Sequence, residues 1–324
     1  MSPKISIIIP AYNTEKYIQD CLESCINQTL KEIEIIIIDD CSIDNTINIA
    51  EQYKKKDDRI VILKNTCNKG PFYSRKNGTL HASGNYILYL DSDDFIDINT
   101  CKLTYELAIK NHADIINFGM QTIPYKKKHT FITGSTEIKS NEAIAYDIFI
   151  GNKSNRRIKM YPVCGHLFEK SLLKDAFKIM QFKKDKLKSC EDILQIFIIS
   201  LLANKSIGTK DIFYFYRNNP TSTTRRNDDE NINNRCNNHN MIIYYLNNLE
   251  STLLGDHIYF HKLKNKIINW LKYNNNFSKR YLRKSNNIIP AYLLYTTLSL
   301  RYCFRLKNVI RIIIYIFSLS TIKK

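Results

Sequence analysis

The chain has 324 residues, an apolar fraction of 44% and a formal net charge of +17. Its length and apolar content exclude a wholly disordered chain and suit one large domain, or a domain with an appendage. The charge is uneven: residues 1–110 carry 13 Lys and Arg against 16 Asp and Glu, whereas residues 231–324 carry 15 against 2. This contrast in charge predicts that the first and last parts of the chain have different functions.

Cysteine usage and the absence of long apolar runs indicate the compartment. The chain has nine Cys, an odd number, and no CxxC pair, and it starts without the pattern of a signal peptide. These features favour free thiols in a reducing cytoplasm. The longest apolar run, from Val309 to Leu319, is interrupted by Arg311 and falls short of the ~20 residues that cross a bilayer. We therefore expect a cytoplasmic protein without a membrane span.

Strands and helices alternate in the first 90 residues. Apolar patterns predict strands over residues 4–9, 33–38, 59–64 and 86–90, and helices over residues 17–28, 46–55 and 73–82. The unbroken β-branched run from Ile33 to Ile38 is typical of a strand covered on both faces. Alternation with short connections predicts an α/β fold built on a mostly parallel, doubly wound sheet.

Polar side chains follow three of these predicted strands. Tyr12 comes after the first strand, Asp39 and Asp40 end the second, and the segment from Asp91 to Asp94 ends the fourth. Ligands of such sheets bind beyond the carboxyl ends of the strands. We therefore expect these side chains to line one pocket.

The pattern is less regular beyond residue 110. Strands are predicted over residues 114–119, 131–133 and 212–216, and helices over residues 140–149, 193–202, 241–249, 257–273 and 291–318. The segment from Arg225 to Asn240 is dense in Asn, Asp and Arg, and we interpret it as a mobile loop or linker. The chain contains no internal repeat.

The segment Asp91-Ser92-Asp93-Asp94 places three carboxylates within four residues. Like charges this close repel each other, and a cation among them removes that cost. Carboxylate oxygens suit Mg²⁺ or Mn²⁺, ions that commonly bridge to nucleotide phosphates. The alternative is a solvated acidic turn that caps a helix through Asp94 or Asp97. The position at a strand end favours the metal.

Several sequence blocks resemble family 2 glycosyltransferases, enzymes with the GT-A fold. The matching blocks, in order and at the family's spacing, are Ile5 to Asn13, Ile38 to Ser42 with Asp44 and Thr46, Asn68 to Gly70, Arg75, and Gly84 to Asp94. The resemblance implies a GT-A domain over residues 1–230, in which residues 1–110 bind the nucleotide sugar and residues 111–230 form the acceptor side. Residues 231–324 are then a basic helical C-terminal region.

The resemblance also implies residue roles on the donor side. Asp40 resembles the carboxylate that accepts a hydrogen bond from the uracil ring of a UDP-sugar, and Pro10 and Tyr12 match the segment that lines the base pocket. Arg75 resembles the arginine that reaches the diphosphate, a suitable use of a fork-shaped cation. Asp91 resembles the first Asp of the DxD motif, which lies near the ribose or sugar hydroxyls.

Metal and base are implied in the same way. Asp93 resembles the carboxylate linked to Mn²⁺ or Mg²⁺, and Asp94 is a candidate to share or replace it. Glu191-Asp192 matches the family's Glu-Asp pair, so Asp192 is expected to take the proton of the acceptor hydroxyl in an inverting transfer. Without the family pattern, these two acids would be interpreted as helix N-terminal residues that interact with the macrodipole.

The expected activity is an inverting transfer from a UDP-sugar to a glycolipid or oligosaccharide acceptor. Cys25 to Thr29, Ile35 to Cys41 and the Tyr- and Lys-rich tail resemble lipooligosaccharide β-1,3-galactosyltransferases, which implies galactose or a related hexose. One alternative is a nucleotidyltransferase, but Pro10 to Asn13 is not the Gly-rich loop expected of one. The other is a sugar-nucleotide-binding protein without turnover.

The basic C-terminal region suggests a surface rather than a nucleic acid as its partner. No DNA- or RNA-binding motif accompanies the charge, and the Tyr, Ile and Leu positions follow helical spacing. Basic amphipathic helices suit an anionic membrane surface. We expect peripheral binding at the inner face of the cell membrane; the alternative is a solvated packing subdomain.

Overall fold

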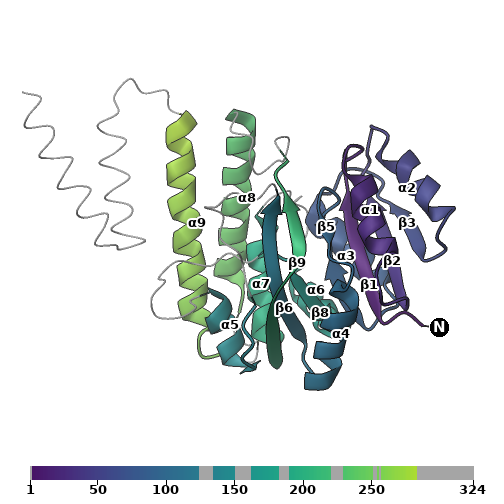
Figure 1. The fold of residues 1–324 in the computed structure, drawn as a ribbon. Coiled ribbons are helices and arrows are strands. Elements are labelled where there is room, and N and C mark those ends of the chain that lie inside the picture. The colour runs from purple at the N-terminus through teal and green to yellow at the C-terminus, as the bar shows by residue number, and fades with distance from the viewer. Residues whose placement is uncertain are drawn as a thin grey trace, which may run out of the picture. The chain divides into compact units, whose positions relative to one another are not determined.

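The computed structural model describes residues 2–123, 134–149, 162–181, 190–219, 229–250, 254 and 257–282. The chain divides into two compact units, one of residues 1–222 with 251–259 and one of residues 223–250 with 260–324. The first unit contains the sheet, and the second contains two long helices (Figure 1). The functional division of the chain at residue 230 stays a prediction.

The first unit is built on one mixed sheet. Its strands are β1 (Ile5–Ala11), β2 (Ile33–Asp39), β3 (Ile60–Lys64), β4 (Tyr86–Tyr89), β5 (Phe95–Ile96), β6 (Ile115–Ile123), β7 (Lys139–Ser140), β8 (His166–Glu169) and β9 (Lys205–Arg217). They follow the order β3-β2-β1-β4-β8-β6-β9-β5, with β7 beside β9. The strands β3, β2, β1 and β4 are parallel, as are β6 and β9. The strand β8 runs antiparallel to both of its neighbours and joins the two parallel sets.

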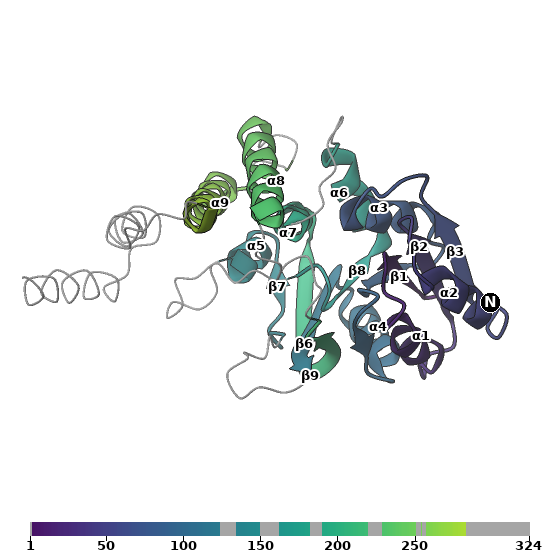
Figure 2. The same ribbon diagram turned by 90° about the horizontal axis from the view of Figure 1, so that it is seen from above.

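Helices cover both faces of this sheet. They are α1 (Ile18–Ile26), α2 (Thr46–Lys54), α3 (Pro71–His81), α4 (Thr100–Asn111), α5 (Glu142–Phe149), α6 (Lys170–Ile179) and α7 (Glu191–Leu202). Figure 2 shows α3 and α6 on one face of the sheet, and α1, α2 and α4 on the other. The predicted α/β class with a mostly parallel sheet is confirmed.

Burial follows the apolar patterns of the chain. The strand β2 lies between β1 and β3, and its residues from Ile35 to Ile38 are at most 1% exposed. The helix α3 approaches this layer closely because Gly78 has no side chain. A Cβ there would lie 2.5 Å from Ile8 Cγ2 and 2.8 Å from Ile38 Cδ1. The close approach holds α3, which carries Arg75, against β1 and β2.

The second unit corrects one prediction. The segment Arg225 to Asn240 was expected to be a loop or linker, but residues 229–248 form helix α8 (Asp229–Asn248). The expectation was wrong because the Asn-rich segment contains residues that form a buried face: Ile232, Cys236 and His239 are all at most 4% exposed. This spacing of four and three residues is helical, and apolar burial outweighs the low helix propensity of Asn.

The helices α8 and α9 (Phe260–Leu282) pack against each other within the second unit. Buried Asn275 joins them, because its Oδ1 lies 2.6 Å from His239 Nδ1 and its Nδ2 donates to Asn240 Oδ1 at 2.8 Å. The predicted strand over residues 131–133 and helix over residues 291–318 lie outside the described residues. Within the described part of the chain, no helix combines the length and the apolar character that a membrane span requires.

Candidate functional site

The strands β1, β2 and β4 run parallel, so their carboxyl ends lie at the same edge of the sheet. That their polar side chains line one pocket stays a prediction. The turns after β1 and β2 are held against each other: Asp40 N donates to Ala11 O at 2.9 Å, and Asn13 Oδ1 accepts from Ile43 N at 2.9 Å. Asn13 and Cys41 take positive φ angles of 54° and 67°, a conformation found at tight turns. The two turns therefore present their polar groups from a fixed backbone.

Asp40 is the organising carboxylate of this edge. It is 3% exposed and accepts hydrogen bonds from three donors: Asn65 Nδ2 at 2.8 Å, Lys69 N at 2.8 Å and Gly70 N at 2.7 Å. Gly70 takes a φ of 86° and precedes Pro71, the first residue of α3, an arrangement suited to a helix start. Asp40 thus ties the segment after β3 to the end of β2 and fixes where α3 begins.

Arg75, on α3, lies at the centre of the site. Its guanidinium is ion-paired with three carboxylates: Nη2 with Asp91 at 2.8 Å, Nη1 with Asp192 at 2.9 Å and Nη1 with Glu191 at 3.2 Å. Its side chain is 3% exposed, and its Nε has no acceptor among the described residues. The neighbouring acids hold the pKa of Arg75 well above its usual value despite burial. This one cation joins α3, the end of β4 and the start of α7.

Glu191 and Asp192 form the first turn of α7, where negative side chains interact favourably with the helix dipole. Burial raises the pKa of both groups, although Arg75 opposes the rise. Asp192 also accepts a hydrogen bond from Val163 N at 3.3 Å. Its side chain remains 27% exposed, against 7% for Glu191. Asp192 is therefore the member of the pair that a ligand can reach.

The acidic turn after β4 divides into exposed and buried carboxylates. Asp94 is 1% exposed and accepts from Tyr214 Oη at 2.6 Å and from Arg217 N at 2.7 Å, so both of its oxygens are bonded to β9. Asp93 is half-buried and accepts from Asn219 Nδ2 at 3.0 Å. Burial raises the pKa of both acids. Asp91 and Asp93 thus face the edge of the site, whereas Asp94 anchors β9 to the turn.

The residues predicted for the site come from five parts of the chain. Pro10 is half-buried at the end of β1, and Tyr12, in the turn that follows, is 47% exposed. Asp40, Arg75, Asp91 and Asp192 add the end of β2, α3, the end of β4 and α7. The ion pairs of Arg75 bring Asp91 and Asp192 together directly. Among the described residues, no hydrogen bond or ion pair joins Tyr12 to the Arg75 cluster.

Sequence reasoning missed two polar residues that organise the site. Asn219 connects Asp93 to Tyr17, whose Oη donates to Asn219 Oδ1 at 3.3 Å. Asn65 connects Asp40 to α3 by donating to Ser74 Oγ at 3.1 Å. Each lies just past the end of a strand, β9 or β3. Their position at strand ends was the only signal in the sequence. It is a weak signal, because Asn residues are common in turns.

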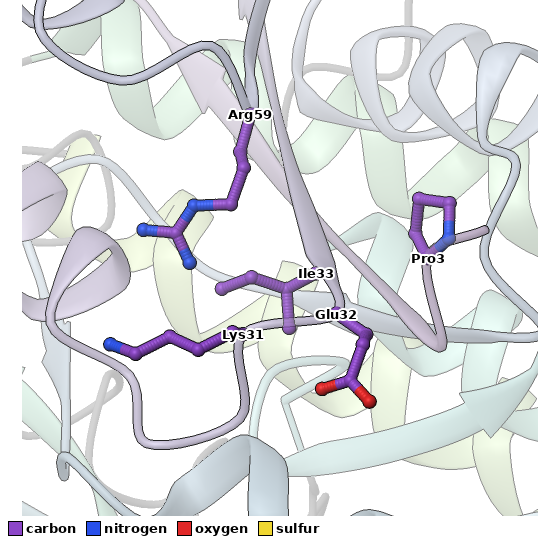
Figure 3. A pocket seen from close by; sticks show the side chains of 5 residues that line it. All are labelled: Pro3, Lys31, Glu32, Ile33 and Arg59. Atoms are coloured by element: carbon purple, nitrogen blue, oxygen red, sulfur yellow. The ribbon is translucent and has the colours of Figure 1, made fainter. Parts of the chain in front are cut away.

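A hollow of about 400 Å³ lies elsewhere, at the amino ends of β1 and β2 (Figure 3). Pro3, Lys31, Glu32, Ile33 and Arg59 line it. Glu32 is paired with Lys4 at 2.6 Å, and Arg59 with Asp57 at 2.6 Å. It lies at the opposite edge of the sheet from the carboxylate cluster, and its Glu32 and Arg59 already have partners. We therefore place the functional site at the carboxyl edge.

Comparison with known proteins identifies the chain's relatives. The model of the family described as "Glycosyl transferase family 2" matches residues 6–177, more than half of the chain. A poly(ribitol-phosphate) beta-glucosyltransferase of Bacillus spizizenii is 43% identical over 115 residues, which are 35% of this chain and 18% of the relative. The poly(ribitol-phosphate) beta-N-acetylglucosaminyltransferase TarS of Staphylococcus aureus is 35% identical over 122 residues, 37% of this chain and 21% of the relative. The matches thus span about a fifth of the length of these relatives.

Solved structures extend the likeness beyond the matched segment. Residues 1–349 of S. aureus TarS in complex with UDP-GlcNAc align with a TM-score of 0.61 at 22% identity, over 92% of this chain and 81% of that one. Another crystal structure of TarS residues 1–349 aligns with a TM-score of 0.60 at 23% identity, over 92% of this chain and 80% of that one. This likeness concerns the fold and confirms the predicted GT-A architecture.

The burial of Asp94 predicts a pH dependence of stability. Burial, together with the charges of Asp93 and Asp91, raises the pKa of Asp94 to about 8, whereas an unfolded Asp titrates near ~4. The folded chain therefore holds a proton that the unfolded chain releases between these values, and stability falls as the pH rises through this window. Asn imitates the protonated acid. Asp94→Asn is therefore expected to reduce the loss of folding stability between about pH 5 and pH 8 by roughly 1–3 kcal/mol.

Urea unfolding of the wild type and the variant at the two pH values measures this difference. Asp58→Asn is the matched control, because Asp58 is exposed and its replacement is expected to leave the pH dependence unchanged. If the free energy of unfolding changes equally with pH in the wild type and in Asp94→Asn, Asp94 is ionised in the folded chain and the prediction is wrong.

Proposed function

Because the chain belongs to glycosyl transferase family 2, we propose that it transfers a hexose from a UDP-sugar to a glycan acceptor with inversion at the anomeric carbon. The observation that carries this proposal is the Arg75 cluster. The Arg75 guanidinium is ion-paired both with Asp192, a partly exposed carboxylate, and with Asp91, the carboxylate that follows β4. A base and a donor-binding group therefore lie on either side of one guanidinium.

The donor side of the proposal rests on Asp40, Pro10, Tyr12 and Arg75. Three N–H donors hold the Asp40 carboxylate in one orientation, and a carboxylate has about four acceptor positions, so one remains for the uracil N–H. Pro10 and Tyr12 lie on the neighbouring strand end and supply the wall of the base pocket. The buried Nε–H of Arg75 lacks an acceptor among the described residues, and a diphosphate oxygen would satisfy it.

The acidic turn fits a divalent cation. Asp91 and Asp93 offer half-exposed carboxylate oxygens, the ligands that Mg²⁺ and Mn²⁺ prefer when phosphates and water complete the shell. Among the described residues, no group of three or more His, Cys, Asp or Glu could hold a metal alone, so the donor phosphates are part of the proposed shell. When bound, the cation neutralises charge on the departing diphosphate.

We propose Asp93 as the main metal ligand and assign Asp94 a structural role. Both oxygens of Asp94 are already bonded, to the Tyr214 hydroxyl and to the Arg217 amide. Binding a cation there would cost at least one of these bonds to β9. Asp91, held by Arg75 at 2.8 Å, is proposed to contact the ribose or sugar hydroxyls.

Asp192 is the proposed base. In the transfer it takes the proton of the acceptor hydroxyl while the oxygen attacks the anomeric carbon and the bond to the UDP phosphate oxygen breaks. The products are the glycosylated acceptor, UDP and a protonated Asp192, which releases its proton to solvent. Burial raises the pKa of Asp192 while Arg75 opposes the rise, and a raised pKa makes a carboxylate a stronger base.

The sugar and the acceptor are proposed more broadly. The sequence resemblance favours galactose or a related hexose and a lipooligosaccharide acceptor. Two relatives are instead named for poly(ribitol-phosphate), which is not a lipooligosaccharide. We therefore propose a surface glycan as the acceptor class. Release of UDP from a panel of UDP-sugars, with each acceptor in turn, selects among them.

Replacement of Asp192 tests the assignment of the base. Asp192→Asn keeps the size of the side chain but removes the proton acceptor, and turnover is expected to fall by roughly 10²–10⁴-fold, with UDP affinity changed only a few-fold. UDP release and UDP titration measure the two quantities. Asp175→Asn, an exposed acid on α6, is the matched control and should retain full turnover. Turnover of Asp192→Asn within threefold of the wild type would contradict the assignment.

We also propose that the basic C-terminal region binds an anionic membrane surface at its cytoplasmic face. Residues 283–324 contain eight Lys and Arg and no Asp or Glu, and each such charge near an anionic surface contributes about 1 kcal/mol. Removal of residues 283–324 is expected to reduce binding to vesicles that contain phosphatidylglycerol at least tenfold, as measured by co-sedimentation. Equal binding by the full and shortened chains would contradict this role.

A further inference from the structure

A second hollow lies beside the carboxyl end of β3. It has a volume of about 260 Å³, and its lining includes Lys64, Lys69, Lys76, Asn65, Tyr73 and Asn77. Tyr73, Lys76 and Asn77 are on α3, at spacings of three and four residues that place them on one face of the helix. Lys64 ends β3, and Lys69 precedes α3. The end of β3, the segment that follows it and α3 thus contribute three lysines and two amides to the lining of one space.

The side chains that line this hollow carry an excess of positive charge. Among the described residues, none of its three lysines takes part in an ion pair, and no Asp or Glu lines the hollow. Lys69 and Lys76 are nevertheless half-buried. Like charges held together in a partly desolvated space repel each other. In the hollow of Figure 3, by contrast, both Glu32 and Arg59 have charged partners.

Hydrogen bonds fix the walls of this hollow. Asn77 Nδ2 donates to Asn65 Oδ1 at 3.2 Å, and Asn65 Nδ2 donates to Asp40 Oδ1 at 2.8 Å. The Lys69 amide donates to the same Asp40 oxygen at 2.8 Å. Because Asp40 is itself buried, the backbone that carries the lysines is tied to the end of β2. Arg75, one residue before Lys76, points instead into the carboxylate cluster.

We propose that this hollow binds a phosphate ester that is not part of the sugar donor. A phosphate carries a compact charge of about −1.5 to −2, and three ammonium groups offset it. The space of about 260 Å³ accommodates the phosphate together with its ester group. Asn77 Nδ2 donates one of its two N–H groups to Asn65 Oδ1, and its second N–H is proposed to orient the ligand. This binding goes beyond the proposed transfer and needs no turnover to be measured.

Glycerol 3-phosphate is a suitable probe for the full-length protein. With UDP and Mn²⁺ present at saturation, it is expected to protect Lys64, Lys69 and Lys76 from acetylation at least threefold, as read by mass spectrometry. Lys102, Lys110 and Lys174, which are exposed elsewhere on the first unit, should show no protection. Protection that UDP abolishes would overturn the proposal, because the hollow would then belong to the donor site.

A pair of matched variants tests the same point by affinity. One carries Lys64→Gln, Lys69→Gln and Lys76→Gln, and the other carries Lys102→Gln, Lys110→Gln and Lys174→Gln, so that both lose the same charge. Calorimetry is expected to show at least tenfold weaker binding of glycerol 3-phosphate by the first variant and unchanged binding by the second. Equal losses would indicate attraction by the net charge alone and would overturn the proposal. If the first variant does not fold, the protection of Lys64, Lys69 and Lys76 from acetylation in the wild type tests the proposal instead.

Vesicles distinguish two sources of the phosphate ester. If the ester is a lipid headgroup, the first variant should bind phosphatidylglycerol vesicles at least tenfold more weakly than the second. If it belongs to a soluble glycan, the two variants should bind vesicles equally but differ in their affinity for glycerol 3-phosphate. Absence of any difference in both assays would overturn the proposal.

Discussion

The guanidinium of Arg75 is buried among the carboxylates of Asp91, Glu191 and Asp192, and the site depends on this contact. Burying an arginine or a carboxylate alone is costly, and removing one partner of such a cluster costs about 3–5 kcal/mol. The four side chains come from α3, the end of β4 and the start of α7. Their mutual neutralisation therefore fixes the relative position of three elements that are distant in sequence.

Other contacts of the first unit position the elements that meet at Arg75. Gly78 lets α3 approach β1 and β2, Asp40 sets the start of α3, and Asp94 fastens β9 to the turn that carries Asp91. The antiparallel strand β8 inserts between β4 and β6, and Val163, just before it, donates to Asp192. In the proposed reaction the donor side and the base side thus share one rigid support.

Sequence patterns predicted the first half of the fold because each strand there is a continuous apolar run, such as Ile33 to Ile38, and each turn carries polar residues. The strand ends and the resemblance to family 2 glycosyltransferases singled out Asp40, Asp91 and Asp192 as candidate site residues, but did not predict that Arg75 pairs with both Asp91 and Asp192. Such ion pairs depend on how distant elements pack, which periodicity does not encode. The helical nature of residues 229–240 was missed for a related reason: only Ile232, Cys236 and His239 mark the buried face among many Asn residues, and their burial depends on packing that the sequence pattern does not show.

The most direct test of the Arg75 account is the turnover of Arg75→Lys, measured as UDP release with a UDP-sugar and an acceptor. Lysine keeps the positive charge, so the fold should persist, but a single ammonium cannot replace the fork that spans Asp91 and Asp192. Turnover of Arg75→Lys is expected to lie at least 100-fold below that of the wild type. Turnover within twofold of the wild type, with the fold intact, would contradict the central role of this guanidinium.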